Sequence, residues 1–200
     1  MEELKPGLWT WTAPHPAWTP EAEGWEREVR SYAYDAGDSL VLFDPLVSAD
    51  EVAKLAAGRP VVVLLTCRWH VRSSSDLVQR LGATVHAPAG VDGLAVATVP
   101  YELGEDLAGD VEPQVGGYPD EATLWLREHA ALVVGDVFLG GERGFHVQPD
   151  SWLTDGMTHD GLRDGLRPLL ELPVEMLLVT HGNPILGDAH ATLERAIEET

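Results

Sequence analysis

The sequence predicts an α/β domain with mixed sheets, in which apolar strands end at polar side chains. Short runs rich in β-branched and aromatic residues alternate with segments of helical spacing. One run, VVVLLT at 61–66, is apolar enough for a strand covered on both faces. With 200 residues and 44% apolar content, the chain suits one globular domain spanning residues 1–200 with a substantial core.

The first half of the chain predicts a β-α-β-α-β order. Ala36-Gly37-Asp38 separates two strand-like runs, as in a hairpin. Ser48 is a plausible helix N-cap, and Gly58 stops the same helix. The serines of SSSDLVQRLG are expected to cap and start a second helix. The expected elements are a hairpin over 29–46, a helix over 48–58, a strand over 61–66, a helix over 73–82 and a strand over 83–88.

The second half predicts strands, a helix, one more strand and a closing helix. Gly104, Gly117 and His129-Ala130 mark turns between the first strands. The expected strands are 96–103, 110–117, 122–128, 130–136 and 174–182, and the expected helices are 161–172 and 188–199.

Four of the seven tryptophans lie in the first 25 residues, where three prolines also occur. Because proline interrupts regular structure, we expect this segment to pack as an aromatic cover without long strands or helices. It could line an apolar cleft, together with Trp69 and the loop 140–152.

Charge and composition exclude several classes of protein. Thirteen basic and 33 acidic residues give a net charge of -20, which disfavours nucleic acid and anionic membranes as partners. The start MEELKPGLW lacks the features of a secretory signal, and no apolar run is long enough to span a bilayer. A single cysteine excludes an internal disulfide framework. We expect a cytoplasmic protein whose partner, if any, is a small molecule; the oligomeric state stays open.

Polar side chains follow three of the predicted strands. LLT leads into the segment 67–72, LVVGD ends at Asp136, and LLVTH ends at His181. Ligands commonly bind beyond strand ends in sheets that helices cover, because several loops converge there. The three strand ends are therefore expected to share one site.

The order of these elements, with LLT, GATVHAP, ALVVGD and LLVTHGNPILGD, resembles the metallo-β-lactamase superfamily along nearly the whole chain. The resemblance implies an α+β fold, a four-layer αββα sandwich with a site at one edge of its sheets. Typical members carry His-x-His-x-Asp-His after the LLT strand, and further ligands in Gly-His, Gly-Asp and His-Gly turns. These hold one or two zinc or iron ions that activate water for hydrolysis.

The superfamily motif is only partly present. Asp136 and His181 match, whereas the Gly-His turn corresponds to Gly116-Gly117 without histidine. Counting from Thr66, the four motif positions hold Cys67, Trp69, Val71 and Arg72; one residue of slippage gives Arg68, His70, Arg72 and Ser73. The resemblance implies catalytic candidates His70, Asp136, His181 and Arg72. Of these, His70, Asp136 and His181 can bind at most one zinc or iron ion. Apart from that ion, we expect either no cofactor or one that the sequence does not identify.

Three functions follow from this partial motif. The first is a metallo-β-lactamase-fold protein with an eroded metal site, not a conventional di-metal hydrolase. The second is a single-metal hydrolase of an ester, thioester or lactam. The third is a non-catalytic module that binds a small molecule or a partner. Whether the chain is an enzyme stays open.

Each singled-out residue also has a simpler interpretation. Cys67 is more typical of a small buried residue than of a nucleophile. His70, Asp136 and His181 can brace their turns, and Asp44 is expected to support the site turn from behind. Because a buried carboxylate needs a partner, we expect Arg72, or else Arg68, to contact Asp136 directly or through one water.

Overall fold

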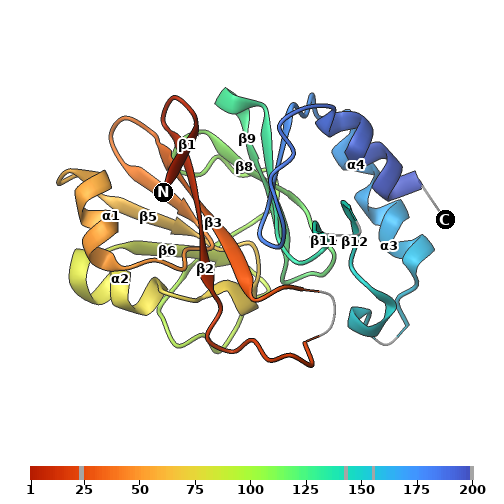
Figure 1. Ribbon diagram of the computed structural model, residues 1–200, viewed down its shortest axis with the longest axis horizontal. Helices are drawn as coiled ribbons and strands as arrows, with labels where there is room; N and C mark the ends of the chain where they lie inside the picture. Colours follow the sequence, from red (N-terminus) through yellow and green to blue (C-terminus); the bar gives the residue numbers. More distant parts are fainter. Residues whose placement is uncertain (23–24, 142–143, 155, 199–200) are drawn as a thin grey trace.

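Two β-sheets lie face to face in the computed structural model, with helices on both outer sides (Figure 1). The structure describes residues 1–22, 25–141, 144–154 and 156–198. The predicted four-layer αββα sandwich is thereby confirmed. Among the described residues, every helix is too short or too polar to cross a lipid bilayer.

The first sheet contains the N-terminal half of the chain. Its strands follow the order β1 (Glu2–Lys5), β2 (Leu8–Pro14), β3 (Glu28–Asp35), β4 (Leu40–Phe43), β5 (Val61–Leu64), β6 (Thr84–Pro88) and β7 (Val99–Tyr101). Strands β3 and β4 form the predicted hairpin, and β4 to β7 run parallel. Helices α1 (Ala49–Ala56) and α2 (Ser74–Leu81) connect parallel strands and bury Val52 and Leu77 against the outer face.

The second sheet contains the C-terminal half. Its strands follow the order β13 (Met176–Val179), β10 (Ala131–Val134), β9 (Ala122–Leu126) and β8 (Val111–Val115). Helices α3 (His159–Leu166) and α4 (Ala189–Glu198) bury Leu162 and Leu193 on its outer face. A small pair, β11 (Phe138–Leu139) with β12 (His146–Val147), was not predicted and lies beside this sheet.

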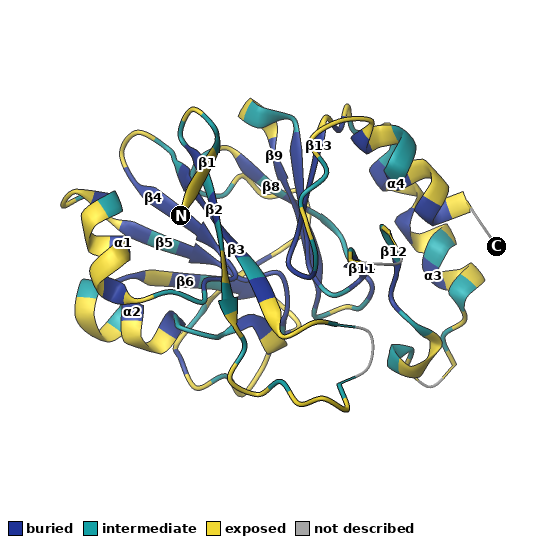
Figure 2. Ribbon diagram, viewed as in Figure 1, coloured by how far each residue is buried: buried dark blue, intermediate teal, exposed yellow. Residues whose placement is uncertain are grey.

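The two faces of each strand bury different side chains. In β10, Ala131 and Val133 face the core between the sheets, whereas Leu132 and Val134 face the helices. This alternation follows from the two-residue period of a strand, and explains why a run without polar residues suits a strand covered on both faces. Figure 2 shows the strands of both sheets largely as buried.

Residues 2–5 and 8–14 form strands, so the prediction of an irregular cover is wrong for them. Strand β2 pairs antiparallel with β3 from Leu8 opposite Tyr34 to Pro14 opposite Glu28. Pro14 is tolerated because β1 pairs with β2 only from Leu8 to Thr10, so that β2 is an edge strand at Pro14. Trp11 packs on the outer-face core, and its Nε1 donates to the backbone carbonyl of Leu46.

Two helix starts differ from the prediction. The hydroxyl of Ser73 accepts a hydrogen bond from the backbone N–H of Val47 and does not cap α2. The helix expected over 161–172 begins at His159 with Thr158 as its cap and continues beyond Leu166 as a 3-10 turn. Residue 199, at the end of the last expected helix, lies outside the described residues.

Candidate functional site

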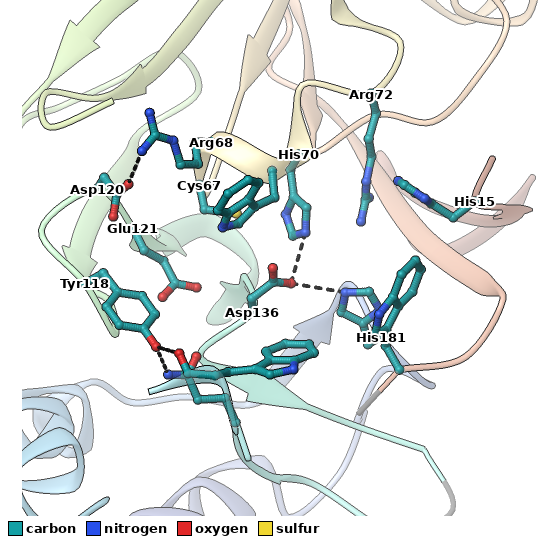
Figure 3. A pocket seen from close by; sticks show the side chains of 14 residues that line it. His15, Cys67, Arg68, His70, Arg72, Tyr118, Asp120, Glu121, Asp136 and His181 are labelled. Atoms are coloured by element: carbon teal, nitrogen blue, oxygen red, sulfur yellow. Dashed lines mark hydrogen bonds and ion pairs between the residues drawn. The ribbon is translucent and has the colours of Figure 1, made fainter. Parts of the chain in front are cut away.

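The three predicted strand ends meet at one edge of the sandwich. Oδ1 of Asp136, after β10, lies 3.0 Å from Nε2 of His70 and 3.1 Å from Nε2 of His181, which follow β5 and β13. In Figure 3 the two rings approach the Asp136 carboxylate from different elements. The structure thus brings the three sequence candidates together, while their role as metal ligands stays a prediction.

Asp44 holds the site turn from behind, as expected. It is fully buried after β4 and adopts a left-handed conformation, with φ 47°. Its Oδ1 accepts the backbone N–H of Thr66 at 2.9 Å, and its Oδ2 accepts the hydroxyl of Thr66 at 2.7 Å. Oδ2 also lies 2.9 Å from Nδ1 of His70. This contact places a proton on Nδ1 and leaves Nε2 to face Asp136.

Cys67 belongs to the same cluster. It precedes the 3-10 helix Arg68–His70, and the backbone N–H of His70 donates to the carbonyl of Cys67. Side chains three residues apart lie on the same side of a 3-10 turn. One ligand atom each from Cys67, His70 and Asp136 lie within 4.8 Å of one another. Cys67 stands at a ligand position of the superfamily motif, but the ligands of that motif are histidine and aspartate, so the motif alone does not identify a cysteine ligand.

The charges of this cluster depend on one another. Burial alone would raise the pKa of Asp136, but the charge of His70 and the hydrogen bond from His181 hold it well below its usual range. Burial alone would lower the pKa of His70, but the negative groups around it, including Asp136 and Asp44, hold it well above its usual value. Burial lowers the pKa of His181. Without a metal, His70 is therefore the cationic partner of Asp136.

Cys67 is poorly suited to act as a nucleophile in the absence of a metal. It is buried, and burial raises the pKa of its thiol to about 11. The thiolate, which is the reactive form, is scarce at neutral pH under these conditions. The interpretation of Cys67 as a small buried residue fits this environment better.

The described residues show no direct contact between an arginine and Asp136, so the prediction is wrong for a direct contact. Contact through one water stays a prediction. Nη1 of Arg72 donates to the backbone carbonyls of Asp44 at 2.8 Å and Arg30 at 3.2 Å. Arg68 extends away from the cluster and lies 3.5 Å from a carboxylate oxygen of Asp120 (Figure 3). Asp136 is instead paired with His70 and His181, because the ends of β5, β10 and β13 meet at this edge of the sheets.

Glu121 is a site residue that the sequence analysis missed. It is buried before β9, where Oε1 accepts the backbone N–H of Val137 at 2.8 Å and Oε2 accepts that of Gly117 at 3.0 Å. Burial and the charge of Asp136 raise its pKa to about 8. A Cβ atom on Gly135 would lie 2.7 Å from Oγ1 of Thr66 and 2.8 Å from Oε1 of Glu121, so a larger residue there would displace these side chains. An acidic residue directly before the apolar run ATLWL was the only sequence signal.

A pocket of about 380 Å³ opens onto these groups. Aromatic side chains form much of its wall: Trp25, Trp69, Tyr118 and Trp152. Trp25 also contacts the edge of His181, with ring centroids 5.3 Å apart. Of the loop 140–152, Gln148 and Trp152 line the pocket, whereas residues 142–143 lie outside the described residues. The expected apolar cleft is therefore present, bordered by part of the N-terminal segment.

No protein-family model matches this sequence, and no curated protein matches it significantly. Solved structures do match. A metallo-β-lactamase from Erythrobacter litoralis is 16% identical with a TM-score of 0.70, over 100% of this chain and 96% of that one. A metallo-β-lactamase family protein from Thermus thermophilus is 20% identical with a TM-score of 0.67, over 98% and 78%. The chain has the metallo-β-lactamase fold. TTHA1623 in a di-iron-bound form shares it, at 22% identity, TM-score 0.65 and coverage of 84% and 93%.

The metallo-β-lactamase fold implies one or two metal ions, and the ligand cluster found among the described residues fits one ion. Cys67, His70 and Asp136 supply sulfur, nitrogen and oxygen donors, a set typical of zinc. Arg72 stands at a motif position that a ligand would occupy, and its guanidinium keeps a positive charge that repels a second cation. Trp69, at another such position, is 72% exposed.

Proposed function

We propose that this protein is a hydrolase of the metallo-β-lactamase fold that works with one metal ion in place of two. The ion is bound by Cys67, His70 and Asp136, with His181 beside them. The observation that supports this most directly is the convergence of three different ligand atoms within 4.8 Å. The Asp44 contact at the other ring nitrogen of His70 adds support, because metal-binding histidines usually donate that N–H to a carboxylate or a carbonyl.

The metal and the side chains have separate tasks in this proposal. A divalent ion in such a site supplies Lewis-acid catalysis of hydrolysis. Asp44 orients the ring of His70, and the backbone N–H groups of Gly117 and Val137 fix the carboxyl group of Glu121. Glu121 lines the pocket, and a carboxyl group held there can take part in proton transfer to a leaving group.

The substrate class follows from the resemblance to the superfamily and from the pocket. We propose an ester, a thioester or a lactam, because a single metal site of this kind suits hydrolysis of an activated acyl group. The pocket volume falls within the usual range for small-molecule sites, which is about 300–1,000 Å³.

Elemental analysis tests this proposal. Protein purified without chelators is expected to contain about one equivalent of zinc or iron per chain, and to hydrolyse at least one of the three compound classes. Cys67→Ser and His70→Gln should each lower the metal content, whereas His159→Gln, outside the pocket, should not. Two equivalents of zinc or iron per chain would contradict the proposed single-metal site. No uptake of added zinc or iron would leave the metal-free binding module as the function.

A further inference from the structure

Arg72 carries a positive charge that has no ionic partner in the described parts of the chain. In residues 1–22, 25–141, 144–154 and 156–198, no carboxylate oxygen lies within 4.0 Å of its guanidinium. Arg68, four residues earlier, pairs with Asp120 within that distance. Among the described residues, Arg68 and Arg72 are the arginines that line the pocket, and the charge of Arg68 is paired with a carboxylate, whereas that of Arg72 is not.

The backbone directs this guanidinium into the pocket. Arg72 has φ 40°, in the left-handed region that non-glycine residues rarely adopt. Nη1 is fixed by the carbonyls of Asp44 and Arg30, while Nε is shielded and has no acceptor among the described residues. Arg72 lines the pocket, and Figure 3 shows its guanidinium between His70 and His15. Nη2 is therefore the donor group that remains for a ligand.

The rest of the pocket favours a ligand with one negative charge and an apolar body. Trp25, Trp69 and Trp152 offer aromatic surface. Asp120 and Asp136 also line the pocket, and they repel a doubly charged phosphate more than a singly charged carboxylate. A carboxylate is also the group that guanidinium hydrogen bonds match best.

We propose that Arg72 anchors the carboxylate of a small apolar acid whose body packs against the pocket tryptophans. This inference rests on the proposed function for one point only, namely that the anchored acid is the substrate class of the single-metal hydrolase. The substrate would then be an ester, thioester or lactam that carries a second, free carboxylate.

Binding of non-hydrolysable probes tests the anchor separately from the metal. Chelator-treated protein is titrated with phenylacetate, phenylacetamide and phenyl phosphate, and quenching of tryptophan fluorescence is measured. Phenylacetate is expected to bind at least tenfold more tightly than the other two. Arg72→Gln should abolish the preference over phenylacetamide, and Arg72→Lys should retain part of it. Arg80→Gln, at an exposed position outside the pocket, should leave it unchanged.

Equal affinity for phenylacetate and phenylacetamide would overturn the inference, and so would a preference that survives Arg72→Gln. Tighter binding of phenyl phosphate would overturn the choice of carboxylate. If the Arg72 variants do not fold, phenylglyoxal modification of the unchanged protein decides, with mass spectrometry to locate the product. Phenylacetate, but not phenylacetamide, should protect Arg72; absence of protection would contradict the anchor. Failure to bind metal in the elemental analysis would not affect any of these outcomes.

Discussion

Nδ1 of His70 lies 2.9 Å from Oδ2 of Asp44, and this contact fixes the direction of the ring toward Asp136. Asp44→Asn removes the charge and places an amide donor against N–H groups. We expect the free energy of unfolding to fall by about 3 kcal/mol, since breaking a buried charged pair typically costs about 3–5 kcal/mol. Denaturant titration measures the loss. Asp92→Asn, at an exposed position, is the control, and a similar small change in both variants would contradict the prediction.

The contact between His70 and Asp136 should contribute more to stability than the pair Arg68 and Asp120. The first pair is largely buried, whereas the side chains of the second are 38% and 29% exposed. Double-mutant cycles with His70→Gln and Asp136→Asn in chelator-treated protein should give a coupling of about 1–3 kcal/mol. Arg68→Gln with Asp120→Asn should give about 0.2–1 kcal/mol. Additive effects at His70 and Asp136 would show that the two groups do not interact in solution.

Glu121 should make the protein less stable as the pH rises through the neutral range. Its pKa is raised from 4.5 to about 8, so the folded chain holds a proton there that the unfolded chain releases. The unfolding free energy should therefore fall between these pH values, by up to about 1.4 kcal/mol per pH unit. Glu121→Gln should reduce the pH dependence of the unfolding free energy, even if the substitution also changes stability by the same amount at every pH. Glu194→Gln, on the exposed side of α4, should leave the pH dependence unchanged. An unchanged slope in Glu121→Gln would mean that the carboxyl group ionises normally.

Cys67 should react slowly with alkylating reagents while the chain is folded and metal-free. Its thiol is buried, with a pKa raised to about 11, and only the thiolate reacts. We expect iodoacetamide at pH 8 to label the folded protein at least tenfold more slowly than the protein unfolded in guanidinium. Mass spectrometry follows the reaction without ambiguity, because Cys67 is the single cysteine. Comparable rates would indicate an exposed or activated thiol.

The sequence predicts the sandwich well because apolar periodicity carries most of the information about layers. The runs that became β10 and β13 are buried on both faces, and that of β5 is buried except for the partly exposed Val62. The polar ends of all three converge at one edge of the sheets. The N-terminal strands were missed because prolines suggested irregular structure. Pro14 occurs where β2 ends, and this position is decided by pairing with β3, which no local pattern reveals.

The chemistry of the site was harder to predict, because it depends on single backbone angles and short turns. In a linear comparison with the superfamily motif, Cys67 and His70 occupy ligand positions only in two different registers. The 3-10 turn nevertheless places both side chains on the same side of the chain, next to Asp136. The direction of Arg72 follows from its positive φ and from two carbonyl groups, neither of which the sequence encodes locally. Glu121 was overlooked because burial, and not its neighbours in the chain, makes it unusual.

The positive charge of the Arg72 guanidinium does not depend on the supply of metal ions. A centre with two ions loses all of its added positive charge when a cell is starved of metal, or when a chelator removes both ions. Here one positive charge is covalently part of the chain, held by the carbonyls of Asp44 and Arg30, and it cannot be exchanged or withdrawn. If Arg72 anchors a carboxylate as proposed, that anchor does not depend on the metal supply, and only hydrolysis depends on the availability of the ion.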